Sequence, residues 1–310
     1  MVTIDFLDDP VEFLAVAGER LAADPVLSIV VTRVTARARD DDAAGVAPPP
    51  GVPRWWAVVR DGGEVVGLAM RTAPFEPFPP YILPMEEDAA AALARALHDR
   101  GEAVAAANGA LPAVRVFVEE TARMTGGTAD VGIHLRLFEL GELVSPLGVP
   151  GELRRVRSDE LDLTLHWLEL FMADADEQAG RERGASPHEA PSREDLVRRI
   201  DKGDYWFWVD RGAPVHLTVG STPAFGVSAI GPVFTPAGCR GRGYASAAVA
   251  AVSRRLLDAG ARVCLFTDQA NPTSNGIYQR LGFRPVTDTA NLVIREPGGP
   301  TDVQPPPRRL

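Results

Sequence analysis

The chain has 310 residues, of which 32 are lysine or arginine and 42 are aspartate or glutamate, so its formal net charge is −10. This balance argues against a nucleic-acid-binding protein, which needs a basic face to displace counterions from phosphates. The two cysteines are too few for a disulfide framework, and no apolar run approaches the ~20 residues that span a bilayer. We therefore expect a cytoplasmic protein, long enough for two domains that each bury a core.

The first half of the chain alternates helical and extended patterns. Apolar residues at helical spacing predict a helix over Leu7–Leu21, and the charged, then Ala-, Gly- and Pro-rich stretch 36–53 predicts an exposed loop. The run WWAVVR, the turn Asp61-Gly62-Gly63 and the run EVVGLAMRT predict a hairpin over 54–72. We expect next a strand at 81–85, a helix at 86–100, a strand at 103–106, a turn at 107–109, a helix at 112–124 and a strand at 134–140.

The second half follows the same order. We expect helices at 159–178 and 192–202, a hairpin of 205–209 with 214–219, a strand at 227–235, a helix from Tyr244 to a C-terminal glycine at Gly260, and a last strand at 289–295. This parallel predicts a tandem pair of mixed α/β (α+β) folds, each with a mostly antiparallel sheet flanked by helices. The end of the chain, 297–310, has three consecutive prolines and is predicted to be a disordered tail.

A glycine-rich turn lies between the strand 227–235 and the helix that begins at Tyr244. Gly241 and Gly243 let the backbone turn tightly and approach a ligand without a Cβ in the way. The first N–H groups of the helix have no intrahelical partner and carry the positive end of its dipole, so they suit a diphosphate. Arg240 and Arg242 add positive charge at the same place.

The first half has a different sequence at the corresponding point. Glu86-Glu87-Asp88 follows its strand at 81–85, with no glycine-rich turn. Three carboxylates at a helix start suit the helix dipole but repel a diphosphate. We therefore expect the first half to serve as a scaffold or as a wall of the substrate site.

The second half resembles the GNAT superfamily of N-acyltransferases. The matching blocks are Arg240-Gly241-Arg242-Gly243-Tyr244-Ala245, then Asn271-Pro272-Thr273-Ser274-Asn275 and Tyr278-Gln279-Arg280-Leu281-Gly282-Phe283. In that family the first block holds the diphosphate of coenzyme A and the second lines its thiol end. The family pattern often has Gln or Arg three residues before the first glycine, where this chain has Gly238. The resemblance implies two tandem GNAT-like domains, a degenerate one at 1–148 and an acetyltransferase domain at 149–296.

The resemblance also assigns site residues, with acetyl-CoA as the co-substrate. Those that would contact it are Val233, Phe234, Thr235, Arg240, Gly241, Arg242, Gly243, Tyr244, Ala245, Ser246, Asn271, Ser274 and Asn275. Asn271, Ser274 and Asn275 are also good helix-capping residues, and that alternative stays open. Gly231 and Pro232 interrupt regular pairing and predict a bulge or splay in the strand before the turn, where the N–H of Val233 would donate to the thioester oxygen.

Tyr278 matches the tyrosine that the family commonly uses as general acid. A phenol, with an ordinary pKa near 10, can protonate a departing thiolate within hydrogen-bond reach; the alternative is a ring that only packs on the cofactor. The general base stays open among His216, the acidic side chains Asp174, Asp176 and Glu177, and a chain of waters. His166 and His188 have no metal-ligand partners nearby and the cysteines form no zinc pattern, so we expect no metal site.

The expected function is the transfer of an acetyl group from acetyl-CoA to a primary amine of a small molecule, by direct attack in a ternary complex. Two alternatives stay open: an acetyltransferase for a protein lysine or N-terminus, and an acyl-CoA-binding sensor without turnover. The oligomeric state also stays open, with a homodimer as one possibility. The sequence leaves the acceptor, the acyl group and the role of the first half open.

Overall fold

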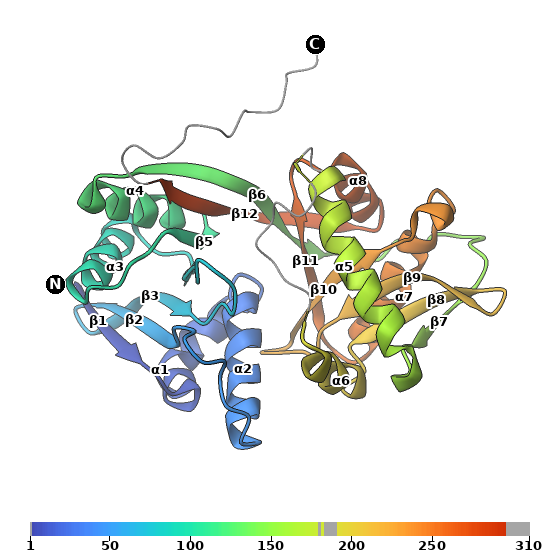
Figure 1. Ribbon diagram of the computed structural model, residues 1–310, viewed down its shortest axis with the longest axis horizontal. Helices are drawn as coiled ribbons and strands as arrows, with labels where there is room; N and C mark the ends of the chain where they lie inside the picture. Colours follow the sequence, from blue (N-terminus) through green and yellow to red (C-terminus); the bar gives the residue numbers. More distant parts are fainter. Residues whose placement is uncertain (1, 179–180, 183–190, 296–310) are drawn as a thin grey trace, which may run out of the picture. The chain divides into compact units, whose positions relative to one another are not determined.

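The computed structural model describes residues 2–178, 181–182 and 191–295, and the predicted tail 297–310 lies outside them (Figure 1). The first set of elements, repeat 1, is β1 Val2–Leu7, α1 Pro10–Ala23, α2 Ile29–Ala43, β2 Trp55–Asp61, β3 Glu64–Arg71, β4 Tyr81–Ile82, α3 Glu87–Asp99, β5 Ala106–Ala110, α4 Ala113–Thr125 and β6 Thr128–Leu140. The second, repeat 2, is β7 Glu152–Arg155, α5 Leu161–Gln178, α6 Arg193–Asp201, β8 Tyr205–Asp210, β9 Ala213–Gly220, β10 Val227–Phe234, α7 Tyr244–Asp258, β11 Arg262–Asp268, α8 Pro272–Arg280 and β12 Phe283–Arg295. Short 3₁₀ turns precede α5 (Ser158–Glu160) and α7 (Ala237–Cys239).

Both repeats have the element order β-α-α-β-β-β-α-β-α-β. Their strand pairings also correspond: β1 and β7 pair antiparallel with β2 and β8, which form hairpins with β3 and β9. The next strands, β4 and β10, are antiparallel to those hairpins and parallel to β5 and β11. The predicted fold class, a tandem pair of mixed α/β folds with mainly antiparallel sheets, is confirmed.

The last strands of the repeats are exchanged. The hydrogen-bonded order is β5-β12-β6-β11, so β12 pairs with the fifth strand of repeat 1 and β6 with the fifth strand of repeat 2. The compact units follow this exchange: unit 1 is Met1–Arg20, Val34–Leu135 and Asp288–Leu310, and unit 2 is Leu21–Arg33 and Arg136–Thr287. The domain boundary between residues 148 and 149 separates the two repeats in sequence and stays a prediction. It does not separate the compact units, because β6 and β12 each belong partly to unit 1 and partly to unit 2.

In unit 1, helices cover both faces of the sheet. Trp55 and Ala57 of β2 point to the face that α3 and α4 cover with Leu93 and Phe117. Trp56 points to the other face, where it stacks on Phe13 of α1 and its indole Nε1 donates a 2.8 Å hydrogen bond to Thr35 of α2. This alternation is the period of two of a β-strand with both faces buried.

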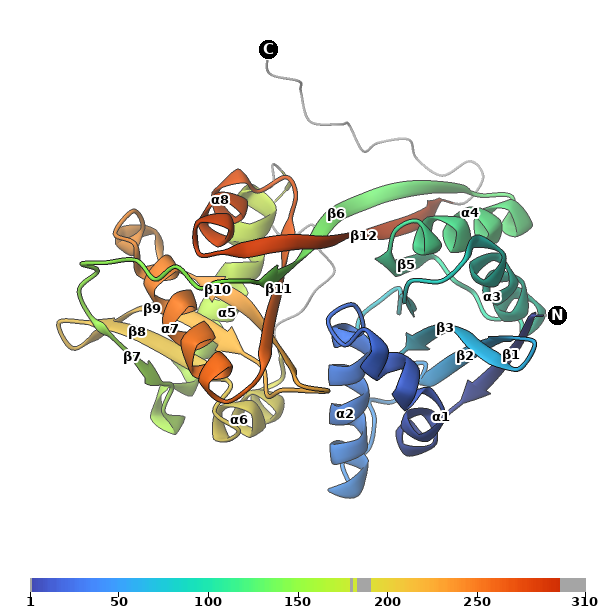
Figure 2. The ribbon, with the colours of Figure 1, turned by 180° about the vertical axis from the view of Figure 1, so that it is seen from behind.

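In unit 2, α5 and α7 lie on opposite faces of the sheet, as Figures 1 and 2 show from the two sides. Trp167 and Leu168 of α5 pack on the face that carries Phe207, Leu217 and Phe234. On the other face α7 packs with Val249 and Val252 against Ile230, Val263 and Leu265. The segment Leu21–Arg33 joins this unit because Val26 and Ile29 cover Val227, Ala229 and Cys264.

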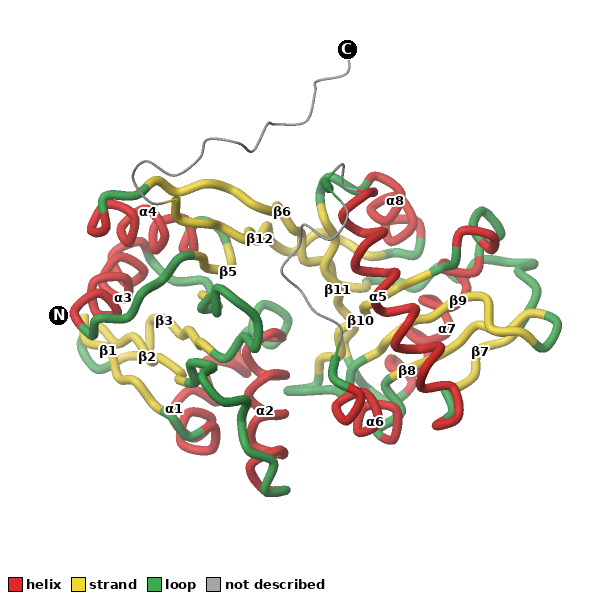
Figure 3. The backbone as a smooth tube through the Cα atoms, in the orientation of Figure 1, coloured by secondary structure: helices red, strands yellow, loops and turns green. Residues whose placement is uncertain are grey.

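Four sequence expectations for repeat 1 were wrong. The strand expected at 103–106 shares only Ala106 with the observed strand β5. The strand β1 was missed, and α2 extends through Ala43 into the stretch 36–53 that was expected to be a loop. The turn expected at 107–109 is part of strand β5 (Figure 3). A Cβ on Gly109 would lie 2.2 Å from the carbonyl oxygen of Ile82, so the glycine is needed because β4 approaches closely, not because the chain turns. In repeat 2 the short strand β7 was missed in the same way as β1.

Candidate active site

The strand β10 leaves its parallel neighbour halfway along its length. Its pairing with β11 runs from Val227 to Ile230 and ends there. Its pairing with β9 shifts register between Ile230 and Val233, then resumes at Val233 and Phe234. The predicted bulge at Gly231 and Pro232 is thus confirmed. Past Ile230, alternate backbone groups of β10 face the β11 side without a strand partner there.

The turn after β10 leads into a helix without a side-chain cap. Gly243 is the N-cap of α7, with φ 82°, and no side chain caps the helix start. Gly241 has φ 76°, and an added Cβ would meet nothing within 4 Å. Both glycines adopt the left-handed region that other residues rarely occupy. The first N–H groups of α7 are therefore available to an anion, at the positive end of the helix dipole.

The two predicted arginines of the turn differ in their surroundings. Arg240 forms an ion pair with Asp174 of α5, and its Nε donates a 2.9 Å hydrogen bond to the carbonyl oxygen of Thr235. Arg242 is exposed beside it. An anion at the turn would therefore meet one exposed guanidinium and one that already has a carboxylate partner.

Tyr244 and Phe234, the two aromatic residues among the predicted cofactor contacts, bury their side chains. Tyr244 is 2% exposed, and its hydroxyl donates a 2.7 Å hydrogen bond to Asp210 at the end of β8. This bond to a carboxylate raises the pKa of the Tyr244 phenol. Phe234 packs its ring against Trp167 of α5. Only the backbone of these two residues can contribute to a ligand site, while Val233, Thr235, Ala245 and Ser246 are half-buried.

The polar residues at the start of α8 shape the loop after β11. The side chain of Asn271 is the N-cap and accepts a 3.1 Å hydrogen bond from the N–H of Ser274. The Asn275 amide donates to the carbonyls of Asp268 and Asn271 at 3.1 and 2.8 Å, and its oxygen accepts from Thr267. The capping alternative thus holds for Asn271, and Asn275 organises the loop, whereas Ser274 uses only its backbone in these contacts.

Tyr278 lies on α8 in the same apolar cluster as Ile230 and Val233 of β10. It is 8% exposed, and its ring meets that of Phe283 edge-on with centroids 5.9 Å apart. Burial raises the pKa of the phenol above its ordinary value, so the hydroxyl keeps its proton. Within the part of the chain that the structure describes, this hydroxyl forms no hydrogen bond and is free to donate one.

The glycine four residues after Tyr278 is required by a close backbone contact. Gly282 has φ 99°, and an added Cβ would lie 1.9 Å from the carbonyl oxygen of Glu142. Its own carbonyl accepts a 3.1 Å hydrogen bond from the N–H of Gly141. Any other residue here would push the end of α8 away from the chain after β6, so Gly282 fixes where Tyr278 lies.

His216 is wrong as a candidate general base. It is 0% exposed, and its Nδ1 and Nε2 lie 2.7 Å from the hydroxyl oxygens of Thr235 and Thr218. Burial lowers the pKa of the imidazole to about 3, so the ring is neutral and has no path to an acceptor. Sequence reasoning missed this three-residue network because only the alternation of β9 places it inside.

Two of the acidic candidates on α5, Asp174 and Asp176, are paired with arginines. Asp176 is 1% exposed and accepts a 3.2 Å hydrogen bond from Arg181, which also donates to Asp268 of β11 at 2.6 Å. With Asp174 on Arg240, the C-terminal half of α5 is thereby joined to both β11 and the glycine-rich turn. Asp174 and Asp176 therefore have a structural role in ion pairs. Their positions do not identify the general base.

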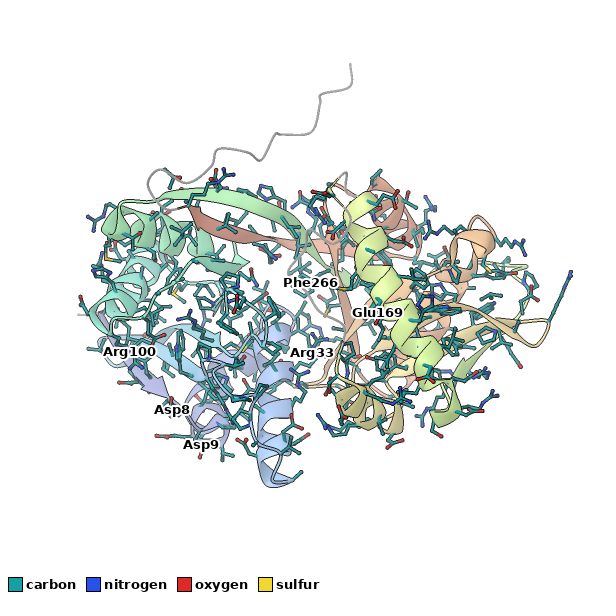
Figure 4. The ribbon with its side chains drawn as sticks, viewed as in Figure 1. Asp8, Asp9, Arg33, Arg100, Glu169 and Phe266 are labelled. Atoms are coloured by element: carbon teal, nitrogen blue, oxygen red, sulfur yellow. The ribbon has the colours of Figure 1, made fainter. Side chains whose placement is uncertain are left out.

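Neither a hollow in unit 1 nor any metal-ligand group or membrane span gives another candidate site among the described residues. A hollow in unit 1 is lined by Asp8 and Asp9 (labelled in Figure 4) with Val11, Arg39, Asp42, Ala43 and Arg54, and it contains none of the predicted site residues. Among the described residues, no group of three or more His, Cys, Asp or Glu could hold a metal ion. No described helix combines the length and the apolar character that a membrane span requires.

The comparisons with known proteins agree with this geometry. Residues 221–292 match the family model of the FR47-like proteins. An acetyltransferase of the GNAT family from Colwellia psychrerythraea is 9% identical, with a TM-score of 0.55 over 95% of this chain and 100% of its own. A GCN5-related N-acetyltransferase from Sphaerobacter thermophilus is 15% identical, with a TM-score of 0.57 over 96% of both chains. A Drosophila protein is 13% identical, with a TM-score of 0.64 over 94% of this chain and 98% of its own.

None of the curated proteins matches the chain. The solved structures share its fold along nearly the whole length, and the family model covers β10, the turn, α7, β11 and α8. The chain thus has the fold of GNAT acetyltransferases, and its residues 221–292 are similar to the FR47-like proteins.

Proposed function

We propose that the protein transfers an acetyl group from acetyl-CoA to a primary amine of a small molecule, by direct attack in a ternary complex. The observation that carries this proposal is the parallel pairing of β10 with β11. Because the strands are parallel, the connections that follow them leave at the same edge of the sheet. That edge therefore holds both the uncapped start of α7 and the helix that carries Tyr278.

The residues present fit acetyl-CoA as a substrate. A diphosphate suits the free N–H groups at the start of α7, where Gly241 leaves open space and Arg242 adds charge. The pantetheine arm suits the stretch of β10 past Ile230, which offers backbone groups on the side that β11 has left. Extended amide-containing ligands bind such a strand by main-chain hydrogen bonds.

In the proposed reaction, the amine nitrogen forms a bond to the acyl carbon while the bond from that carbon to sulfur breaks. The N–H of Val233 donates to the thioester oxygen as negative charge develops there. Tyr278 gives its proton to the departing thiolate, which a buried and protonated phenol can do at neutral pH. The proton lost by the amine passes to water, since His216 is buried and Asp174 and Asp176 are held in ion pairs.

The acceptor that we propose is a small cationic amine. The net charge of −10 favours encounter with cations over encounter with anions. This preference concerns the rate of association and does not select one amine.

The test is thiol release from acetyl-CoA with a panel of small amines, and separately with lysine-containing peptides. Steady release with a small amine, and none without an acceptor, supports the proposal. Release with peptides alone would assign a protein acceptor instead. Saturable binding of acetyl-CoA without release for any acceptor would make the protein a sensor.

A further inference from the structure

Thr235 lies at the joint between β10 and the glycine-rich turn. It follows the last residue of β10, at a point where β11 is no longer a partner. Its carbonyl oxygen accepts the hydrogen bond from Nε of Arg240, within the turn. Its hydroxyl oxygen lies 2.7 Å from Nδ1 of His216. Thr235 therefore connects the strand, the turn and the interior of unit 2.

The imidazole of His216 is enclosed between two threonine hydroxyls. Nε2 lies 2.7 Å from the hydroxyl of Thr218, two residues further along β9, so the ring bonds at both nitrogens. Residues two apart on a strand point to one face. Gly220 shares that face, and a Cβ on it would lie 2.8 Å from Val252 of α7. The network therefore lies on the side of the sheet that α7 covers.

Both ring nitrogens of His216 have a hydrogen-bond partner in this network. A neutral imidazole has one N–H donor and one acceptor nitrogen, and a threonine hydroxyl can take either role. Burial keeps the ring neutral, so one nitrogen donates to one hydroxyl and the other accepts from the second. A β-branched threonine has few side-chain rotamers, so a bond to its hydroxyl also restrains its backbone.

We propose that His216 is a positioning residue for acyl-CoA, which acts through Thr235 to fix the glycine-rich turn relative to the N–H of Val233. This inference rests on the proposed function, because it assigns the diphosphate to the turn and the thioester oxygen to Val233. It gives the buried histidine a role other than that of a base. The bond from Nδ1 to the Thr235 hydroxyl then holds the site for the diphosphate at a fixed distance from the site for the thioester oxygen.

The two threonines offer a matched pair of substitutions. Thr218 lies within β9, which β8 and β10 hold on both sides. Thr235 lies beyond the end of β10 and has no such strand partners. Thr218→Val and Thr235→Val each remove one hydroxyl from the same imidazole and keep the β-branched shape. They should cost similar stability, but only Thr235→Val should release the turn.

The experiment measures thermal stability, kcat and KM for acetyl-CoA in the two variants and in Thr235→Ser, which keeps the hydroxyl. We expect Thr235→Val to raise KM for acetyl-CoA about tenfold and Thr218→Val to change it less than about twofold, at similar losses of melting temperature. Thr235→Ser should restore most of the wild-type KM. Thr235→Ala, which adds no apolar bulk beside the imidazole, replaces Thr235→Val if that variant does not fold.

A second measurement, backbone amide exchange, needs no ligand. It therefore tests this inference independently of the proposed function. Backbone amide exchange over residues 236–243 should be faster in Thr235→Val than in Thr218→Val. If the wild type neither binds nor turns over acetyl-CoA, the proposed function fails while the exchange result still tests the joint. Equal exchange and equal KM in the two variants would overturn the inference and leave His216 as a core residue only.

Discussion

The two repeats differ most in the connection between their fourth strand and the helix that follows. Each repeat has an Ile-X-Pro sequence at its fourth strand, Ile82-Leu83-Pro84 in repeat 1 and Ile230-Gly231-Pro232 in repeat 2. After Pro84 only residues 85–86 precede α3, whereas residues 233–243 lie between Pro232 and α7. The short connection ends in three carboxylates at the helix start, and the long one carries two arginines and two left-handed glycines.

The comparison separates the framework of the fold from its chemistry. Strand order, hairpins and crossover helices are the same in both repeats, so the framework alone does not create a ligand site. The segment 233–243, which is the end of β10 and the turn after it, provides the uncapped helix start and the stretch of β10 that no longer pairs with β11. In repeat 1 the helix that corresponds to α8 is α4, which contains no tyrosine. Repeat 1 therefore lacks both the proposed anion site and the proposed acid.

The largest effect is expected for the residue that has no counterpart in repeat 1. Tyr278→Phe should lower kcat about 100-fold or more, because the thiolate then leaves without a proton donor. Binding of acetyl-CoA should change little, as the ring and its contact with Phe283 remain. Steady-state kinetics with a matched control, Tyr205→Phe on β8, tests this; Tyr205 is also buried, at 1% exposure. Equal rates for Tyr278→Phe and the wild type would remove the general-acid role.

The next effect concerns stability in acid and the strand β9, whose counterpart β3 has no histidine. Burial lowers the pKa of His216 to about 3. Between pH ~6.5 and that value, the imidazole is protonated in the unfolded chain and neutral in the folded protein. Stability should therefore fall with falling pH in this window, by up to about 1.4 kcal/mol per pH unit from this group. Urea unfolding at several pH values should show a shallower fall for His216→Gln. The same slope in both proteins would contradict the assignment.

A smaller effect is expected in the turn itself, which repeat 1 lacks. Gly241→Ala forces a side chain into a left-handed conformation, which costs about 1–2 kcal/mol, and places a methyl group in the space left for the ligand. We expect about tenfold weaker binding of coenzyme A by calorimetry. Gly238→Ala is the matched control, because its Cβ would also meet nothing within 4 Å and its φ is not in that region. Equal losses for the two variants would argue against a backbone cradle at Gly241.

The smallest effect is expected from the ion pair that joins α5 to the turn. Asp174→Asn should strengthen binding of coenzyme A about two- to fivefold, since Arg240 then has no carboxylate competing with a phosphate. The gain should disappear at high salt, where surface ion pairs are screened. A loss of affinity in Asp174→Asn would instead mean that the carboxylate orients Arg240 for the ligand.

The sequence was sufficient for the elements whose signals are local. The glycine-rich turn, the helix from Tyr244 and the bulge at Gly231 and Pro232 each depend on residues within a few positions, and all three are present. The exchange of β6 and β12 could not be predicted, because it depends on pairings between residues far apart in the chain. The edge strands β1 and β7 were missed because short strands with mixed polarity give little periodic signal.

At the site, too, the sequence could not predict contacts between residues that are far apart in the chain. Arg240 was correctly placed in the turn, but its partner Asp174 is on another element and no spacing indicates the pair. His216 looks like any strand histidine in sequence, and only the three-dimensional alternation of β9 encloses it between Thr218 and Thr235. Contacts between elements, unlike turns and caps, require the fold to be known.

The most direct test of the central claim is the number and location of coenzyme A molecules bound per chain, measured by calorimetry together with amide exchange. We predict one molecule per chain, with slower exchange over residues 236–246 and unchanged exchange over 83–90. Replacing Glu86, Glu87 and Asp88 by their amides should leave the number at one. Absence of binding, or protection at the start of α3 instead of α7, would contradict the account.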